Sequence, residues 1–189
     1  MVLLFSLAGS IGGPGYLPDV AAIHSLAANR AGIVSPAIWV TQIGGAPILL
    51  TILLGAIAWL ALKRGWRPAL ELGAIVMSGR IAVELLKMLI DRPRPEFLPY
   101  PVKIASLSFP SGHAANTMIT FLALALLAAP ERWRIPAIGA ALAASGIIGA
   151  TRPLLGVHWP TDVVGGWAFG IFWVIVGVAL TRCSGNTAK

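Results

Sequence analysis

Long apolar stretches, broken only by short polar segments, constrain this chain more than any other feature. The 189 residues are 57% hydrophobic and 11% charged, whereas a soluble domain carries about 25% charged residues. A helix that crosses a membrane needs roughly 17–25 mostly apolar residues. We therefore predict an all-α integral membrane protein. No polar linker divides the sequence, so we expect a single domain over residues 1–189.

The expected fold is a bundle of five to six transmembrane helices. Five stretches are predicted to span the membrane, the fourth of them short for a span: residues 38–62, 68–90, 112–129, 135–150 and 163–181. Residues 1–17 are a candidate for a sixth, shortened helix. Residues 19–30 are expected to form an amphipathic helix lying at the membrane interface.

The chain has a formal net charge of +7, and its basic residues form clusters between the apolar stretches. No basic face is interleaved with aromatic residues, so nucleic-acid binding is not expected. Three clusters fall on one side of a five-helix bundle: Lys63, Arg64 and Arg67; Arg132 and Arg134; Arg182 and Lys189. Because positive loops stay in the cytoplasm, residues 91–108 and 151–161 are predicted to face outward, in a bacterial inner membrane toward the periplasm.

Those outward loops also contain basic residues that topology does not explain. They are Arg92, Arg94, Lys103 and Arg152. A bound anion would account for them. Aromatic residues mark the membrane boundary in many proteins, and tryptophans near the predicted helix ends fit that pattern: Trp39, Trp66, Trp133 and Trp159.

The first polar segment runs from Lys87 to Arg94 and Pro95. Arg80, Glu84 and Lys87 share one face of the helix predicted at residues 68–90, because their spacing is four and then three residues. We interpret Arg80 and Glu84 as a structural ion pair and Lys87 as a functional cation. The guanidinium of Arg94 matches two phosphate oxygens. An anchor for anionic lipid head groups is the alternative for this segment.

The second polar segment, Pro110-Ser111-Gly112-His113, comes directly before an apolar helix. Free backbone N–H groups and the helix dipole make such a position an anion site. His113 would then lie beside the anion, where it can supply a proton. The alternative is a serine cap with an interfacial histidine.

In the third polar segment, His158 and Asp162 are four residues apart across Pro160. A carboxylate that accepts a hydrogen bond from one imidazole nitrogen leaves the other nitrogen available as a nucleophile. Arg152 adds a second phosphate clamp. The alternative is a carboxylate that favours the helix start beside an unrelated histidine.

Two histidines and an aspartate also suggest a metal site. Lys87, Arg94 and Arg152 would surround any cation with like charge, however, and like charges repel. We therefore expect neither a metal nor another cofactor.

Together these segments resemble the type 2 phosphatidic acid phosphatase (PAP2) superfamily of integral membrane lipid phosphatases. Its motif K-x6-R-P matches Lys87 to Arg94-Pro95, and P-S-G-H matches Pro110 to His113. S-R-x5-H-x3-D matches residues 151–162, with Thr151 in place of the usual serine. The motif core is residues 87–162.

The resemblance implies a role for each residue. His158 would attack phosphorus and form a phosphohistidine, Asp162 would orient it, and His113 would protonate the leaving oxygen. The phosphoryl oxygens would be held by Lys87, Arg94, Ser111, Gly112 and Arg152. No metal is implied.

The expected function is hydrolysis of a phosphate monoester or diphosphate on a lipid. Polyprenyl diphosphate, phosphatidylglycerophosphate, phosphatidate and a lipid A phosphate are the candidate substrates, and no obligate protein partner is expected. A lipid phosphotransferase with the same site and a non-catalytic lipid-binding protein are alternatives. A vanadate-dependent haloperoxidase is a third, although its soluble relatives lack such apolar spans.

Overall fold

The computed structural model describes residues 11–97, 101–102 and 106–186, which form helices joined by loops and contain no strand. The helices are α2 (Leu17–Asn29), α3 (Val34–Ile43), α4 (Ala46–Arg64), α5 (Trp66–Ile90), α6 (Gly112–Leu127), the short 3-10 helix η1 (Glu131–Trp133), α7 (Arg134–Leu154) and α8 (Pro160–Asn186). The all-α prediction is confirmed for this part of the chain.

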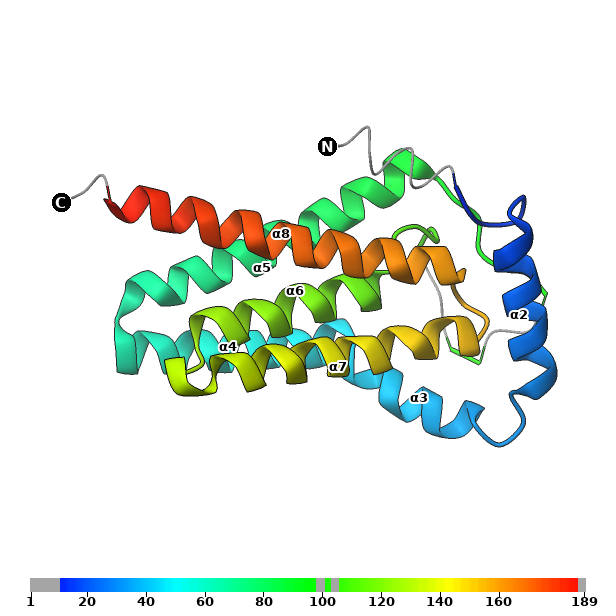
Figure 1. The fold of residues 1–189 in the computed structure, drawn as a ribbon, viewed down its shortest axis with the longest axis horizontal. Coiled ribbons are helices and arrows are strands. Elements are labelled where there is room, and N and C mark those ends of the chain that lie inside the picture. The colour runs from blue at the N-terminus through cyan, green and yellow to red at the C-terminus, as the bar shows by residue number, and fades with distance from the viewer. Residues whose placement is uncertain (1–10, 98–100, 103–105, 187–189) are drawn as a thin grey trace.

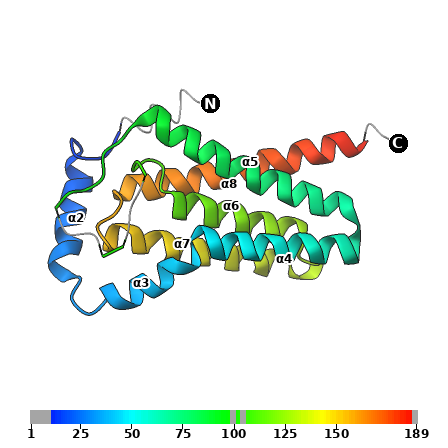
Figure 2. The ribbon, with the colours of Figure 1, turned by 180° about the vertical axis from the view of Figure 1, so that it is seen from behind.

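The bundle is built around α6. This helix packs against α5, α7 and α8, and α4 packs against α5 (Figures 1 and 2). Burial of apolar side chains between these helices forms the main core, which includes Leu72, Val83, Ile119 and Val174. α2 crosses one end of the bundle, on the right in Figure 1, and packs against α7 and α8. The helix expected at residues 19–30 is therefore present, and it closes one end of the protein.

The stretch predicted as one helix over residues 38–62 is two helices. The chain breaks between α3 and α4 at Gly44 and Gly45, whose N–H groups donate to the carbonyls of Thr41 and Gln42. A Cβ on Gly44 would lie 2.6 Å from Ile148 and 3.0 Å from His113. The break thus brings the backbone directly against α6 and α7, which a side chain at this position would prevent.

The other predicted helices are present with shifted ends. Residues 68–90 and 112–129 correspond to α5 and α6, and residues 163–181 lie within the longer α8. The short fourth prediction, residues 135–150, extends to Leu154 because Thr151, Arg152 and Pro153 continue α7.

Three segments of the described chain are long and apolar enough to cross a membrane: Val34–Arg64, Glu131–Leu154 and Pro160–Cys183. α6 is apolar but shorter, with 16 residues. α5 has 25 residues but carries five charged side chains, Arg67, Glu71, Arg80, Glu84 and Lys87. The count of five to six membrane helices stays a prediction. Most of the sixth candidate, residues 1–17, lies outside the described residues.

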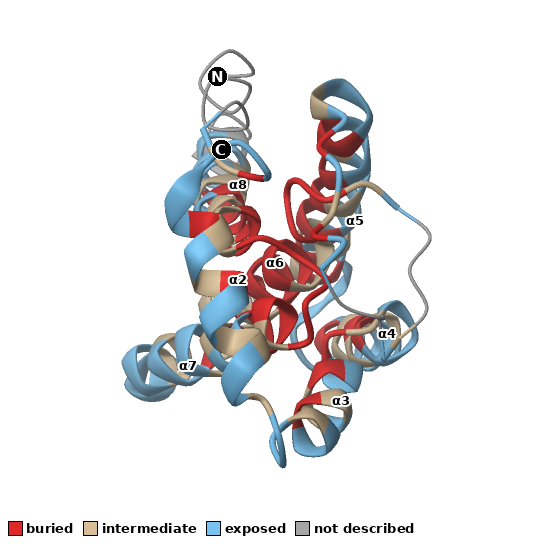
Figure 3. Ribbon diagram, turned by 90° about the vertical axis from the view of Figure 1, so that its right-hand side faces the viewer, coloured by how far each residue is buried: buried red, intermediate tan, exposed pale blue. Residues whose placement is uncertain are grey.

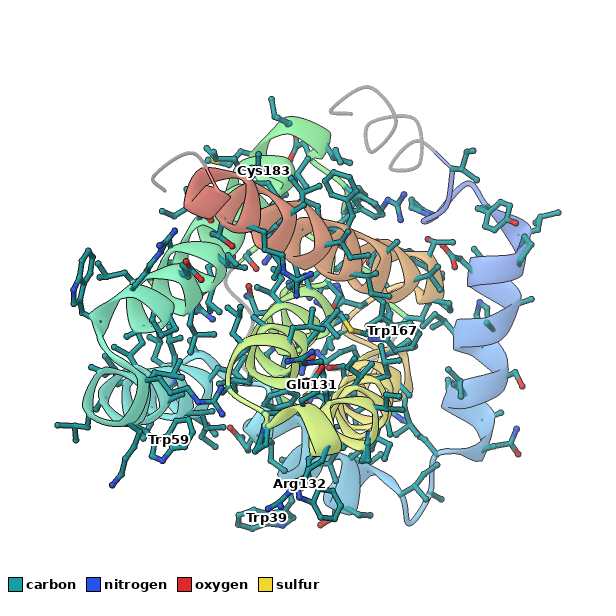
Figure 4. All side chains as sticks on the ribbon, turned by 60° about the vertical axis from the view of Figure 1, so that its left-hand side comes forward. Trp39, Trp59, Glu131, Arg132, Trp167 and Cys183 are labelled. Carbon is teal, nitrogen blue, oxygen red and sulfur yellow. The ribbon has the colours of Figure 1, made fainter. Side chains whose placement is uncertain are left out.

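The tryptophans divide into exposed and buried groups. Trp39, Trp66 and Trp133 are 75%, 72% and 56% exposed, as expected for side chains at a membrane boundary. Trp159 is 1% exposed, so the boundary interpretation is wrong for this residue. Figure 4 shows Trp39 on the outside of the bundle and Trp167 between α7 and α8, where its indole N–H donates to the Ser145 carbonyl (3.1 Å).

Glycines allow α8 to lie directly on α6. A Cβ on Gly166 would lie 2.9 Å from the Ser111 carbonyl oxygen, and one on Gly170 would lie 2.7 Å from Met118 Cβ. This close approach lets the Ser111 N–H donate to the backbone carbonyl of Asp162 (3.0 Å). The starts of α6 and α8 are therefore fixed to each other.

Candidate active site

The three polar segments meet at the end of the bundle that α2 covers. Figure 3 looks onto this end and shows buried loop segments behind α2. The segments come from the end of α5, the start of α6, the end of α7 and the start of α8. Residues far apart in the sequence, from Lys87 to Asp162, therefore share one site.

His158 and Asp162 form the centre of this site. His158 lies in the turn before α8 and is 2% exposed, and its Nδ1 is 3.3 Å from Asp162 Oδ2. The same carboxylate oxygen accepts hydrogen bonds from the Trp159 N–H (2.9 Å) and from the Ser108 hydroxyl. Since its neighbours fix the carboxylate, Asp162 fixes the orientation of the imidazole ring.

Arg94 approaches the opposite side of the ring. Its Nη1 is 3.0 Å from His158 Nε2 and 2.5 Å from the Val157 carbonyl oxygen. The guanidinium also donates to the carbonyls of Ser106 (2.6 Å) and Leu107 (3.1 Å). Arginine only donates hydrogen bonds, so Nε2 is the accepting nitrogen and the proton of neutral His158 resides on Nδ1. The lone pair of Nε2 therefore accepts the hydrogen bond from Arg94.

The surroundings of His158 keep it unprotonated. Burial, followed by the positive charges of Arg94, Arg152 and Lys87, lowers the pKa of His158 well below its ordinary value of 6.5. The imidazole therefore stays neutral at neutral pH, as a nitrogen nucleophile requires.

Lys87 belongs to the last turn of α5, and its side chain reaches the start of α6. Its Nζ donates to the Ser106 hydroxyl (3.0 Å) and is 3.5 Å from Glu84 Oε1. Glu84 thus pairs with Lys87, and within the described residues it makes no ion pair with Arg80. Glu84 is therefore paired along this helix face as expected, but its partner is Lys87 and not Arg80. A Cβ at residue 112 would be 3.2 Å from Lys87 Nζ, so Gly112 gives the lysine room.

Ser111 is the N-cap residue of α6, and Gly112 is its first residue. The Ser111 hydroxyl is buried and has no hydrogen-bond partner within the described residues, and the same holds for Arg152 Nε. Buried polar groups are normally hydrogen-bonded. These two unsatisfied groups are therefore available to bind an anion.

A cavity of about 430 Å³ opens beside these residues. His113 and Arg152 line it, together with Thr41 and Gln42 of α3. Arg152 Nη1 donates to the Thr41 hydroxyl (2.7 Å), so α3 helps to hold the arginine in place. The remaining lining residues are Ile38, Gly45, Pro101 and Val102.

Arg92 was expected to bind an anion together with Arg94 and Arg152, but its position is different. Arg92 Nη1 is 2.7 Å from Asp162 Oδ1, and its guanidinium lies over the Phe109 ring, 4.5 Å from the centroid. Arg92 and Arg94 both precede a proline, so no local signal separates their roles. Ser108 was also missed, and its sequence context carries no motif. Lys103 lies outside the described residues.

Comparison with known proteins identifies the family of this chain. The family model of the PAP2 superfamily matches residues 68–184, more than half of the chain. The protein therefore belongs to the PAP2 superfamily.

Two curated relatives illustrate the range of this family. The chain is 36% identical to the lipid A 1-phosphatase of Rhizobium johnstonii over 133 residues, which cover 65% of this chain and 52% of the relative. It is 32% identical to the decaprenylphosphoryl-5-phosphoribose phosphatase of Mycobacterium tuberculosis over 161 residues, covering 82% and 85%. The chain thus spans about half the length of the Rhizobium protein.

A solved structure has the same fold. The transmembrane PAP2 type phosphatidylglycerolphosphate phosphatase from Bacillus subtilis superposes with a TM-score of 0.85 at 26% identity, and the match covers 96% of this chain and 94% of that one. Because the match includes almost all of a transmembrane protein and the helices here are apolar, this chain is an integral membrane protein.

Proposed function

We propose that this protein is a metal-independent lipid phosphatase that hydrolyses a phosphate monoester or diphosphate carried by a membrane lipid. The observation that carries the proposal is the placement of His158 between Asp162 at Nδ1 and Arg94 at Nε2. A neutral imidazole oriented by a carboxylate is a nucleophile, and a neighbouring guanidinium is suited to phosphoryl oxygens. The named relatives are phosphatases of lipids, which supports the same activity here.

The proposed reaction has two steps. His158 Nε2 attacks phosphorus and the bond from phosphorus to the leaving oxygen breaks. His113, which enters this step as the imidazolium that the bound anionic phosphate favours, gives that oxygen its proton. His113 then takes a proton from water, whose oxygen attacks phosphorus and breaks the P–N bond. Inorganic phosphate leaves and His158 is neutral again. Asp162 stabilises the positive charge that the imidazole carries while the phosphorus is attached.

Five residues are proposed to hold the phosphoryl group: Lys87, Arg94, Ser111, Gly112 and Arg152. Lys87 and the two arginines bring positive charge to the place where negative charge develops, and fixed charges of this kind need no reorganisation during the reaction. The unsatisfied donors of Ser111 and Arg152 are the polar groups best placed to gain a partner when substrate binds.

The leaving group is proposed to occupy the cavity lined by His113, Thr41 and Gln42. Polar and apolar residues share its wall, which suits the junction between a phosphate and a lipid. Phosphatidylglycerophosphate, phosphatidate, polyprenyl diphosphate and a lipid A phosphate all contain such a junction. We propose that residues 1–189 act as one domain, with residues 87–162 as its core.

The site is proposed to face the periplasm from a bacterial inner membrane. The turns α4–α5 and α6–α7 and the end of α8 lie at the opposite end of the bundle (Figure 1), and they carry Arg64, Arg67, Arg132, Arg134 and Arg182. Arg64 also donates to the Leu127 carbonyl (3.2 Å) across that end. The positive-inside rule favours this basic end as the cytoplasmic one.

Phosphate release by the purified protein in detergent, with EDTA present, tests the function. Wild type is compared with His158→Ala on the four candidate lipids, and His24→Ala is the control because His24 is exposed on α2. We expect release by wild type and the control, and none by His158→Ala. Loss of activity in EDTA would contradict the metal-independent mechanism. Disappearance of the donor lipid without free phosphate would identify a phosphotransferase instead.

A further inference from the structure

A second buried carboxylate lies behind the proposed catalytic pair. Asp19 belongs to α2 and is 1% exposed. Its Oδ2 accepts hydrogen bonds from the Gly13 N–H (2.7 Å) and the Thr161 hydroxyl (2.5 Å), and its Oδ1 accepts one from the Thr161 N–H (3.1 Å). Burying a carboxylate is costly unless it is well hydrogen-bonded. The start of α8 supplies two of these three bonds.

Thr161 connects Asp19 to the catalytic pair. Its hydroxyl oxygen lies 2.9 Å from Arg92 Nη1, and the same nitrogen is 2.7 Å from Asp162 Oδ1. Asp162 in turn contacts His158. A continuous series of polar contacts therefore runs from α2 to the imidazole, in the order Asp19, Thr161, Arg92, Asp162 and His158.

The direction of each hydrogen bond in this series is fixed. An ionised carboxylate only accepts and a guanidinium only donates, whereas a hydroxyl does both. The Thr161 hydroxyl must therefore donate to Asp19, which leaves its oxygen lone pair for Arg92. The acceptor oxygen of Asp19 thus keeps the lone pair of the Thr161 hydroxyl directed at Arg92.

The segment before α2 is shaped around the same residues. Gly12 and Gly13 have φ values of 126° and 84°, a region that favours glycine. A Cβ on Gly12 would be 2.2 Å from the Thr161 hydroxyl, and one on Gly13 would be 3.2 Å from Arg92. The Ile11 carbonyl also accepts a hydrogen bond from Arg92 Nη2 (3.2 Å). This N-terminal segment is therefore packed directly on Arg92 and Thr161.

We propose that Asp19 and Thr161 are positioning residues for the phosphatase reaction. They hold Arg92 on Asp162 and thereby, together with Arg94 and the other donors to Asp162, set the orientation and tautomer of His158, so α2 is part of the active site. The inference rests on the proposed role of His158 as the nucleophile. Asp19 lies outside the three motifs, and Thr161 occupies an unspecified position of the third, between His158 and Asp162.

Substitutions at Thr161 and Asp19 separate a positioning role from a structural one. Thr161→Val removes the hydroxyl at nearly constant shape, Thr161→Ser retains it, and Asp19→Asn removes the charge. The matched control is Thr181→Val, because Thr181 is on the same helix and, among the residues that the structure describes, its hydroxyl bonds only the Val178 carbonyl one turn earlier. Each protein is compared for kcat, KM and thermal unfolding in detergent.

We expect Thr161→Val and Asp19→Asn to lower kcat by about 10- to 100-fold, the size of loss that a small misplacement of a catalytic group causes, with KM little changed. Thr161→Ser and Thr181→Val should stay close to wild type. This inference would be overturned if Thr161→Val and Asp19→Asn both kept the wild-type kcat. The proposed function would still stand in that case, provided that His158→Ala inactivates the enzyme. A fall in kcat that follows only the loss of folded protein would also overturn the inference.

Nitrogen NMR of the histidines provides a readout that does not depend on turnover. The chain has three histidines, so His158→Ala assigns the signals of residue 158. In wild type we expect the neutral ring with its proton on Nδ1. Thr161→Val and Asp19→Asn should give a mixture of tautomers, and Thr181→Val should not. An unchanged tautomer in both variants would overturn the inference even if no lipid were hydrolysed.

Discussion

Single side chains decide the chemistry of His158. On one side of the His158 imidazole, the Ser108 hydroxyl and the Trp159 N–H donate hydrogen bonds to the Asp162 carboxylate and fix its position. Arg94 lies on the other side of the imidazole. Cations around a buried imidazole favour its neutral form, so the same charges that would bind phosphate also keep the nucleophile unprotonated. In the proposed mechanism, substrate recognition and activation of the nucleophile would thus depend on one group of cations.

The depressed pKa of His158 predicts the acid limb of the pH profile. Activity requires neutral His158, and a pKa well below 6.5 means that this form persists as the pH falls past 6.5. We therefore expect the loss of kcat/KM due to His158 to have its midpoint below pH 6.5. Two substrates whose phosphate groups ionise at different pH values would distinguish this limb from ionisation of the substrate. An enzyme limb at or above pH 6.5 would contradict the effect of burial and neighbouring charge.

At the scale of helices, close packing of α8 on α6 connects the two halves of the site. Gly166 lies where a side chain would meet the Ser111 carbonyl, and that serine also donates its N–H to Asp162. α6 carries His113, and α8 begins directly after His158. The distance between the two histidines therefore depends on this helix contact.

Gly166→Ala is predicted to destabilise the protein by about 1–3 kcal/mol, the usual cost of overpacking a core. Gly139→Ala is the control, because a Cβ at residue 139 of α7 meets nothing within 4 Å. Alanine is the better helix former, so the control should be neutral or stabilising by up to about 1 kcal/mol. Thermal unfolding in detergent measures both changes. Equal melting temperatures for the two variants would show that α6 and α8 move apart to accommodate the added methyl group without loss of stability, which would contradict the prediction.

For the whole molecule, the position of the basic end predicts the orientation in the membrane. Cys183 is exposed near the end of α8, opposite the site, and it is the chain's single cysteine. A membrane-impermeant maleimide should not label Cys183 in intact spheroplasts but should label it after permeabilisation. Ser25→Cys in a Cys183→Ala background places a thiol on the exposed side of α2 and should be labelled from outside. The reverse pattern would place the site in the cytoplasm.

Local signals account for much of this architecture. Apolar stretches predicted α5, α6, α7 and α8 to within a few residues at most ends, because a helix of this length is specified by its own composition. The split of residues 38–62 was missed, although Gly44 and Gly45 were visible. A glycine pair is tolerated in many apolar helices, and only the approach of Ile148 and His113 explains a break at this one.

The sequence by itself determined the membrane class, the helical elements and the residues proposed for phosphate chemistry, since these depend on composition and on spacing within short segments. Tertiary structure decided which charge pairs with which. Arg92 and Arg94 have the same local context, yet Arg92 binds Asp162 and Arg94 contacts His158. Asp19 joins this group across 142 residues of sequence from Thr161. A buried charge is stabilised by the partners that folding brings within hydrogen-bond distance, and those partners come from separate segments of the chain.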